Sequence, residues 1–269
     1  MTKKKIGLAL GAGGARGFCH IGVLQVLQEN NIPIHVVTGC SMGALVGGGF
    51  VAGVSIEAML EVADSTSNRT VFDLDFLSMI KLRASEGGLA KGERAMNMYR
   101  KHVGETLIED CNIKFAAIAA DLKSKKIHTF KKGVLWQAVR ASMSIPGLFH
   151  PVRMDNKIFV DGGLLKRMPI EEAYELGANI VIAVDAIGPP FDPEDDINSM
   201  FKILELSYQI LDWRGAQYEG KNADILIVPD MGSKSSFKFK NNEEAIQAGR
   251  DAATAALPQI FKKLKMKNK

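Results

Sequence analysis

An α/β fold, with a mostly parallel central sheet and helices on both faces, is predicted by two patterns in this chain of 269 residues. Short apolar runs that suit buried strands alternate with stretches of helical periodicity, and glycine-rich turns separate them. The composition agrees with a globular protein, because 46% of the residues are hydrophobic and 24% are charged. We expect one domain over residues 1–262, followed by a basic tail at 263–269.

The first part of the chain alternates regularly. Its predicted elements are a strand at 5–10, a helix at 15–29, a strand at 34–38 and a helix at 42–52. No Asp, Glu, Lys or Arg occurs between Asn30 and Ile56, which is also typical of a membrane span. Because Pro33 and six glycines divide this stretch into strand, turn and helix, we interpret it as part of a buried α/β core.

The rest of the chain predicts further strands and helices. The strand-like runs are 113–120, 127–130, 157–160, 179–184 and 225–228. Pro169 opens a helix that ends at Gly177. Residues 200–213 predict a longer helix, whose apolar face we expect to pack on the core rather than to contact lipid. Between 64 and 90 the pattern weakens around an amphipathic piece at 71–80, which indicates either an insertion over the site or a packed connecting helix.

The segment Gly39-Cys40-Ser41-Met42-Gly43 lies directly after a predicted strand and directly before a predicted helix. A G-x-S-x-G sequence in this context is typical of a nucleophile elbow, a turn so tight that its flanking positions accept no Cβ. Gly39 and Gly43 meet that requirement. Ser41 stands at the helix N-terminus, where the helix dipole stabilises developing negative charge. Ser41 is therefore the predicted nucleophile, whereas Cys40 is one residue away from the centre of the elbow.

A second glycine-rich loop, Gly11-Ala12-Gly13-Gly14-Ala15-Arg16-Gly17, also follows a strand and precedes a helix. A dinucleotide-binding loop would need glycine at Arg16 and an acidic residue at Thr38, and the Gly-Lys-Ser/Thr of a Walker loop is absent. Because parallel strands end at the same edge of a sheet, we expect this loop to lie beside Ser41. The predicted donors to an oxyanion are the backbone N–H groups of Gly11, Gly13, Gly14 and Met42.

A third motif, Val160-Asp161-Gly162-Gly163, places an aspartate at the end of a predicted strand. Such an aspartate is often only a turn former or a helix cap. In an α/β-hydrolase triad the residues occur in the order Ser, Asp, His. Asp161 cannot be the aspartate of such a triad, because all histidines precede it in the chain. These histidines are His20, His35, His102, His128 and His150. We expect His20, after the first glycine loop, and His35, at the start of a strand, to be structural.

Together, these motifs resemble the patatin-like phospholipase family, in which a glycine-rich oxyanion loop with a basic residue, a G-x-S-x-G elbow and a D-G-G or D-G-A segment occur in this order. The similarity looks close to the small bacterial members and covers roughly residues 5–187. It also includes the segments 17–24, 120–122, 141–149 and 161–169. Many members carry a glycine at the position of Ala12. We expect this difference to affect the conformation of the loop more than its role.

The resemblance implies a catalytic dyad of Ser41 and Asp161 that hydrolyses carboxylic esters of phospholipids or lysophospholipids, without a metal or a cofactor. Arg16 would then either bind a lipid phosphate or brace the glycine loop. One alternative is an acyltransferase, which passes the same acyl-enzyme to an alcohol or a thiol. Another is a lipid-binding regulator without turnover, which the presence of both Ser41 and Asp161 disfavours.

The formal net charge is +4, and lysines concentrate at 3–5, 123–126 and 262–269. These clusters suit either solvated ends or a weak attraction to anionic membranes, and no nucleic-acid-binding motif accompanies them. The cysteines Cys19, Cys40 and Cys111 are too few for a disulfide framework and fit a reducing, cytoplasmic setting. The apolar run after Lys5 enters a glycine-rich loop at once, so we interpret it as a strand rather than as a signal peptide.

Overall fold

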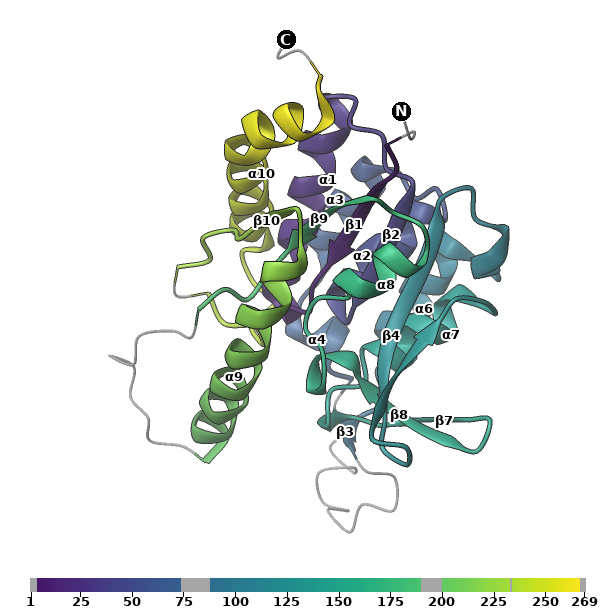
Figure 1. Cartoon of the computed structure of the whole chain (residues 1–269). Coiled ribbons are helices and arrows are strands. Elements are labelled where there is room, and N and C mark those ends of the chain that lie inside the picture. The colour runs from purple at the N-terminus through teal and green to yellow at the C-terminus, as the bar shows by residue number, and fades with distance from the viewer. Residues whose placement is uncertain (1–3, 74–87, 190–199, 233, 267–269) are drawn as a thin grey trace.

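The computed structural model describes residues 4–73, 88–189, 200–232 and 234–266. Its centre is an eight-stranded sheet in the order β10-β9-β1-β2-β4-β8-β7, with β5 also paired to β4 (Figure 1). The strands are β1 (Ile6–Leu10), β2 (Val36–Cys40), β4 (Lys114–Asp121), β5 (Lys126–Phe130), β7 (Val152–Met154), β8 (Lys157–Asp161), β9 (Ile180–Val184) and β10 (Ile225–Ile227). The run from β10 to β4 is parallel, and β5, β7 and β8 pair antiparallel. The predicted fold class is therefore confirmed.

Helices cover both faces of the sheet. They are α1 (Cys19–Glu29), α2 (Met42–Val51), α3 (Ile56–Ser65), α4 (Asn68–Val71), α6 (Glu93–Val103), α7 (Leu135–Ser142), α8 (Ile170–Glu175), α9 (Met200–Glu219) and α10 (Asn242–Leu264). Leu8 and Leu10 of β1 belong to the apolar cluster that includes α1 and α2, whereas Ala9 packs with α8. This alternation follows from the two-residue period of a strand. Figure 1 shows α8 in front of the sheet and α1, α2 and α3 behind it.

The pairing of β4 brings the ends of β2 and β8 together. Positions 117–118 of β4 pair with both β2 and β5, so these two strands lie on opposite edges of β4. Positions 119–121 pair with β5 and with β8, so β8 lies on the same edge as β2. Cys40, the last residue of β2, and Asp161, the last residue of β8, pair with consecutive residues of β4. The two strands therefore meet end to end, and Ser41 follows at this junction.

The sequence did not predict α3, α6, α7 or α10, and α10 is the longest of these helices. It crosses α1 with the two backbones in direct contact, because a Cβ on Gly22 would lie 2.0 Å from the Ile246 carbonyl oxygen. A Cβ on Gly249 would lie equally close to the carbonyl oxygen of Cys19. Many of its apolar residues are alanines and Pro258 interrupts it, so its periodic signal is weak. The expected basic tail begins inside this helix, which continues to Leu264.

Several boundaries differ from the predicted ones. β2 extends to Cys40, beyond the predicted 34–38, so the strand runs directly into the elbow, and α9 extends beyond 213 to Glu219. Within the expected insertion at 64–90, β3 (Gly88–Ala90) pairs with β6 (Gly147–Phe149). Residues 74–87, and with them most of the amphipathic piece at 71–80, lie outside the described residues.

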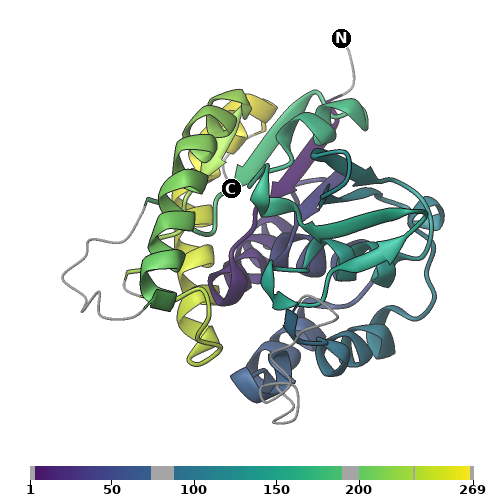
Figure 2. The same cartoon turned by 90° about the horizontal axis from the view of Figure 1, so that it is seen from below.

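None of the helices in the described ranges has the length and apolar character needed to cross a bilayer. In Figure 1, β1 runs downward from the N-terminus. Figure 2, which views the molecule from below, therefore looks onto the carboxyl ends of the parallel strands. Ligands of open α/β sheets bind at this edge. Ser41 follows β2 there, and Asp161 is the last residue of β8 at the same place.

Candidate active site

Ser41 occupies a strained turn between β2 and α2. Its φ of 53° and ψ of −121° are rarely adopted by a residue with a side chain, and such a conformation costs about 1–3 kcal/mol. A Cβ on Gly39 would lie 2.4 Å from the Cα of Ala44, and one on Gly43 would lie 2.2 Å from the Leu10 carbonyl oxygen. Both predicted elbow glycines are thus required by close backbone contacts, and Gly43 fixes the elbow against the end of β1.

Asp161 faces Ser41 from the end of β8. Its side chain is 4% exposed, and its Oδ1 accepts the Gly163 N–H at 2.8 Å. Burial raises the pKa of Asp161 from 3.8 to about 6, and hydrogen bonding from the Ser41 hydroxyl opposes this rise. The Cys40 Sγ lies 3.8 Å from the same Oδ1. Burial, together with this carboxylate, raises the pKa of the Cys40 thiol, so the thiol stays protonated and unreactive.

The last residue of α7 and the segment that follows it hold Ser41 and Asp161 by hydrogen bonds. The Ser41 N–H donates to Oγ of Ser142 at 2.9 Å, and Ser142 is fully buried. The Asp161 N–H donates to the Ser144 carbonyl at 2.8 Å. The sequence assigned no role to Ser142, although the motif that contains it, 141–149, contributes to the family resemblance. We infer that residues 142–144 set the distance between the side chains of Ser41 and Asp161.

The glycine loop contacts the elbow. A Cβ on Gly17 would lie 2.4 Å from Cγ of Met42. Within the described residues, the N–H groups of Gly13 and Gly14 have no hydrogen-bond acceptor. The N–H of Met42, in the first turn of α2, also has no acceptor there, as is usual at a helix N-terminus. Gly11 differs from the expectation, because its N–H donates to the Val184 carbonyl at 3.0 Å and so completes the pairing of β1 with β9.

The side chain of Arg16 is buried and binds backbone carbonyls on two other segments. Its side chain is 4% exposed. Its Nε donates to the Lys234 carbonyl at 2.5 Å, and its Nη1 donates to the Ile187 carbonyl at 2.7 Å. The guanidinium thus connects the loop to the segments after β9 and β10. Of the two roles considered for Arg16, its burial and these contacts favour the bracing one.

The histidines nearest to the motifs are bound to backbone. His20 is fully buried, its Nε2 lies 2.8 Å from the Gly11 carbonyl oxygen, and burial lowers its pKa from 6.5 to about 4. Because a carbonyl only accepts, Nε2 carries the proton of the neutral ring. His35 accepts the N–H of Ile6 at the opposite end of the sheet. In the described ranges, no three His, Cys, Asp or Glu side chains are grouped to hold a metal ion.

Two further groups support the site, and the sequence predicted neither. Arg167 is 1% exposed; its carbonyl accepts the Ala12 N–H at 3.0 Å, and its guanidinium pairs with Asp185 and Asp212. This network joins the glycine loop to β9 and α9. The described residues of the segment 229–241, between β10 and α10, cover the loop, because the Ser236 carbonyl accepts the Ala15 N–H at 2.8 Å. Both groups depend on residues distant in sequence, so no local pattern indicates them.

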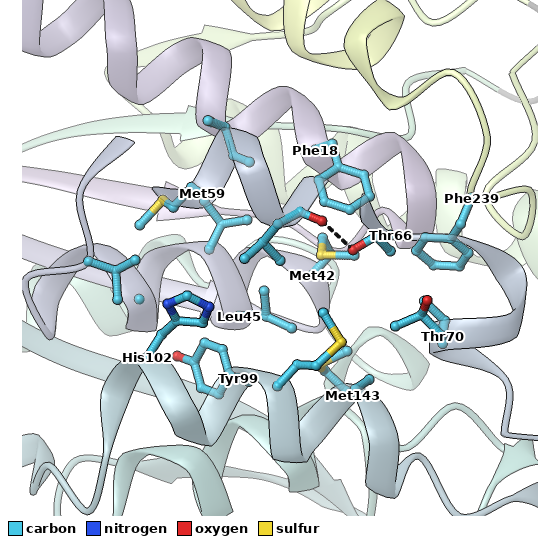
Figure 3. A pocket seen from close by; sticks show the side chains of 18 residues that line it. Phe18, Met42, Leu45, Met59, Thr66, Thr70, Tyr99, His102, Met143 and Phe239 are labelled. Atoms are coloured by element: carbon cyan, nitrogen blue, oxygen red, sulfur yellow. Dashed lines mark hydrogen bonds between the residues drawn. The ribbon is translucent and has the colours of Figure 1, made fainter. Parts of the chain in front are cut away.

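An apolar cavity of about 100 Å³ begins beside the elbow. Met42 and Met143, which line it, directly follow the hydrogen-bonded pair Ser41 and Ser142. Figure 3 shows Met143, Thr70 and Phe239 toward one side of the cavity, and Met59, Tyr99 and His102 toward the other. The residues that line it are mostly aliphatic, aromatic or Met side chains. These surroundings suit a hydrocarbon chain.

The model of the patatin-like phospholipase family matches residues 8–174, which is more than half of the chain. The chain belongs to the patatin-like phospholipase family. The resemblance found in the sequence is thereby confirmed. The matched region contains all the motifs of this patatin-like site, whereas α9, the segment 229–241 and α10 follow it.

Several curated proteins are similar to this patatin-like chain. An uncharacterized NTE family protein of Mycobacterium tuberculosis is 36% identical over 195 residues, which cover 72% of the chain and 52% of that protein. Neuropathy target esterase sws of Drosophila melanogaster is 33% identical, with 69% and 13% covered. Lysophospholipase NTE1 of Candida albicans is 31% identical, with 69% and 13% covered. The chain therefore spans about half the length of the mycobacterial relative and a small part of the other two.

Solved structures share this patatin-like fold. VipD from Legionella pneumophila has a TM-score of 0.55 at 13% identity, with 95% of this chain and 67% of that chain covered. Human GIVD cytosolic phospholipase A2 has a TM-score of 0.54 at 11% identity, with 97% and 60% covered. At such low identities these similarities concern the fold alone.

Proposed function

We propose that this patatin-like protein is a serine acyl hydrolase that cleaves carboxylic esters of phospholipids or lysophospholipids through a dyad of Ser41 and Asp161. The observation that carries the proposal is the end-to-end junction of β2 and β8. At this junction, a serine in a strained turn lies beside a buried carboxylate, at the edge of the sheet where ligands bind.

In the proposed reaction, Asp161 accepts the proton of Ser41 as Oγ attacks the acyl carbonyl. The N–H groups of Gly13, Gly14 and Met42 are the proposed oxyanion donors, because they have no acceptor within the described residues. As the tetrahedral intermediate collapses, the protonated Asp161 gives this proton to the ester oxygen, and the alcohol part of the substrate leaves the acyl-enzyme. Water then attacks the acyl-enzyme with Asp161 as base, the proton returns to Oγ of Ser41, and the fatty acid leaves. With a pKa of about 6, the Asp161 carboxylate is ionised at neutral pH. This pKa also lies close to the operating pH, which favours proton transfer.

The apolar cavity supports a lipid as the substrate, and the names of the relatives, lysophospholipase among them, agree with a phospholipid or a lysophospholipid. We include in the proposal a cytoplasmic location and weak peripheral contact of the lysine clusters with anionic membranes, each well-placed lysine contributing about 1 kcal/mol. Sedimentation with anionic vesicles should then decrease as salt rises. Equal binding to neutral vesicles would exclude the electrostatic contribution.

A fluorophosphonate probe tests the nucleophile. It is expected to label Ser41, and Ser41→Ala should prevent both labelling and ester hydrolysis, whereas Ser124→Ala in the exposed turn after β4 should change neither. Asp161→Asn should lower turnover by about 10²–10⁴-fold, because an amide cannot accept the proton. A label on Cys40, or full turnover by Ser41→Ala, would contradict the dyad. Mass spectrometry of the products with and without an added alcohol distinguishes hydrolysis from acyl transfer.

A further inference from the structure

We infer that Gly49, on α2, limits the length of the acyl chain that the cavity accepts; this inference rests on the proposed function. Helix α2 begins directly after Ser41, and its residues Met42, Leu45, Val46 and Gly49 line the cavity. Residues spaced by three, four and seven positions share one face of an α-helix. The cavity therefore follows the axis of α2 away from the nucleophile.

The helix gives the scale of the cavity. From Met42 to Gly49 the axis advances about 10 Å, because each of the seven steps adds about 1.5 Å. An extended alkyl chain advances roughly 1.3 Å per carbon, given C–C bonds of about 1.5 Å, so this length corresponds to roughly eight carbons. A chain bound along this face reaches position 49 with its middle or its end, according to its length.

Position 49 lies against the far wall of the cavity. A Cβ built on Gly49 would lie 3.3 Å from Cε of Met59, and 3.8 Å from both Cε2 of Tyr99 and Cγ2 of Val54. All three side chains line the cavity. A larger side chain at position 49 would therefore occupy space beside the alkyl chain and close this end. The nearest neighbour is the flexible tip of a methionine, which can move aside, so the substitution is compatible with folding.

The preceding glycines have a different role. A Cβ on Gly47 would lie 2.8 Å from Cγ1 of Val37 in β2, and one on Gly48 would lie 2.5 Å from the hydroxyl of Tyr99. Neither Gly47 nor Gly48 lines the cavity. These two glycines allow α2 to pack closely on its neighbours. Among the three consecutive glycines, Gly49 alone faces the cavity, which makes it the position where the size of a side chain selects the substrate.

Two substitutions with opposite effects test this inference. Gly49→Leu should lower the ratio of kcat/KM for a dodecanoate ester to kcat/KM for a butyrate ester by about 10- to 100-fold. Roughly two to three methylenes of the longer chain would lose their apolar surroundings, and burial of each methylene changes binding by about fourfold. Met59→Ala, which enlarges the same end, should raise that ratio. Ala58→Leu places the same leucine side chain on α3 outside the cavity and should leave the ratio unchanged. An unchanged ratio in both Gly49→Leu and Met59→Ala would overturn the inference.

Binding without turnover separates this inference from the proposed reaction. With Ser41→Ala as the parent, calorimetry of free octanoate and dodecanoate should show that the added Gly49→Leu substitution weakens dodecanoate binding by more than octanoate binding. If wild-type protein hydrolyses no ester but this selectivity is present, the proposed function fails and the length limit stands. If wild-type protein hydrolyses esters through Ser41 and both fatty acids weaken equally, the length limit fails alone.

Discussion

Replacement of Asp161 by asparagine should stabilise the fold at alkaline pH while it removes turnover. Burial raises the pKa of Asp161 from 3.8 to about 6, so the folded protein binds this proton more tightly than the unfolded chain does. The folded state is therefore penalised progressively as pH rises from about 4 to 6, and fully above 6. The rise in pKa corresponds to roughly 3 kcal/mol. Asparagine carries no charge and keeps an oxygen that can accept the Gly163 N–H.

Urea unfolding of wild-type protein and Asp161→Asn between about pH 4 and pH 8 measures this penalty, because other titrating groups cancel in the difference. The variant should gain up to roughly 3 kcal/mol at the alkaline end and almost nothing at the acidic end. Asp185→Asn is the matched control, since this buried aspartate is paired with Arg167. It should lose about 3–5 kcal/mol. The reasoning is refuted if Asp161→Asn gains nothing at alkaline pH, or if its gain does not change with pH.

Three further substitutions test the elements around Ser41 and Asp161. Burial lowers the pKa of His20 from 6.5 to about 4, so its neutral form stabilises the fold above pH 6.5 and this contribution is lost as pH falls through 4. His20→Gln should therefore become more stable relative to wild type toward acidic pH in urea unfolding, and a constant difference would count against this. Gly43→Ala should cost about 1–3 kcal/mol in thermal unfolding and remove ester hydrolysis, because its Cβ would lie 2.2 Å from a carbonyl oxygen of Leu10. Arg16→Lys should lower kcat equally for a phospholipid and for a phosphate-free ester, because one ammonium replaces a fork that binds two carbonyls. A loss confined to the phospholipid would indicate phosphate binding instead.

The parts of the site that local sequence determines were predictable. The elbow needs glycines on both sides of a serine between a strand and a helix, and the five consecutive residues 39–43 meet this requirement. The parallel strands of the central sheet were equally clear, because a buried parallel strand is a short, continuous apolar run. The short strands β3, β6 and β7 were not predicted. The sequence also indicated Asp161 as a candidate, but local pattern could not distinguish a base from a turn former.

The remaining parts depend on pairing between distant segments. The N–H of Gly11 is taken by Val184, a partner on a strand that the sequence does not identify as a neighbour of β1. The environment of Arg167 forms only when α9 and β9 pack together, and a buried arginine has no sequence signature of its own. Ser142 is one small polar residue in a helix end. The crossing of α10 with α1 rests on two glycines that are indistinguishable in sequence from helix breakers.

The junction of β2 and β8 also makes catalysis a late event in folding. Cys40 and Asp161 are 121 residues apart in the chain, and the strand that aligns them lies between. Contacts of such long sequence separation form slowly, because the loop must close before the pairing is gained. A slip of one residue in β8 against β4 would turn Asp161 to the other face of the sheet. Recovered ester hydrolysis during refolding would thus report the moment at which β2 and β8 have both reached their native register against β4.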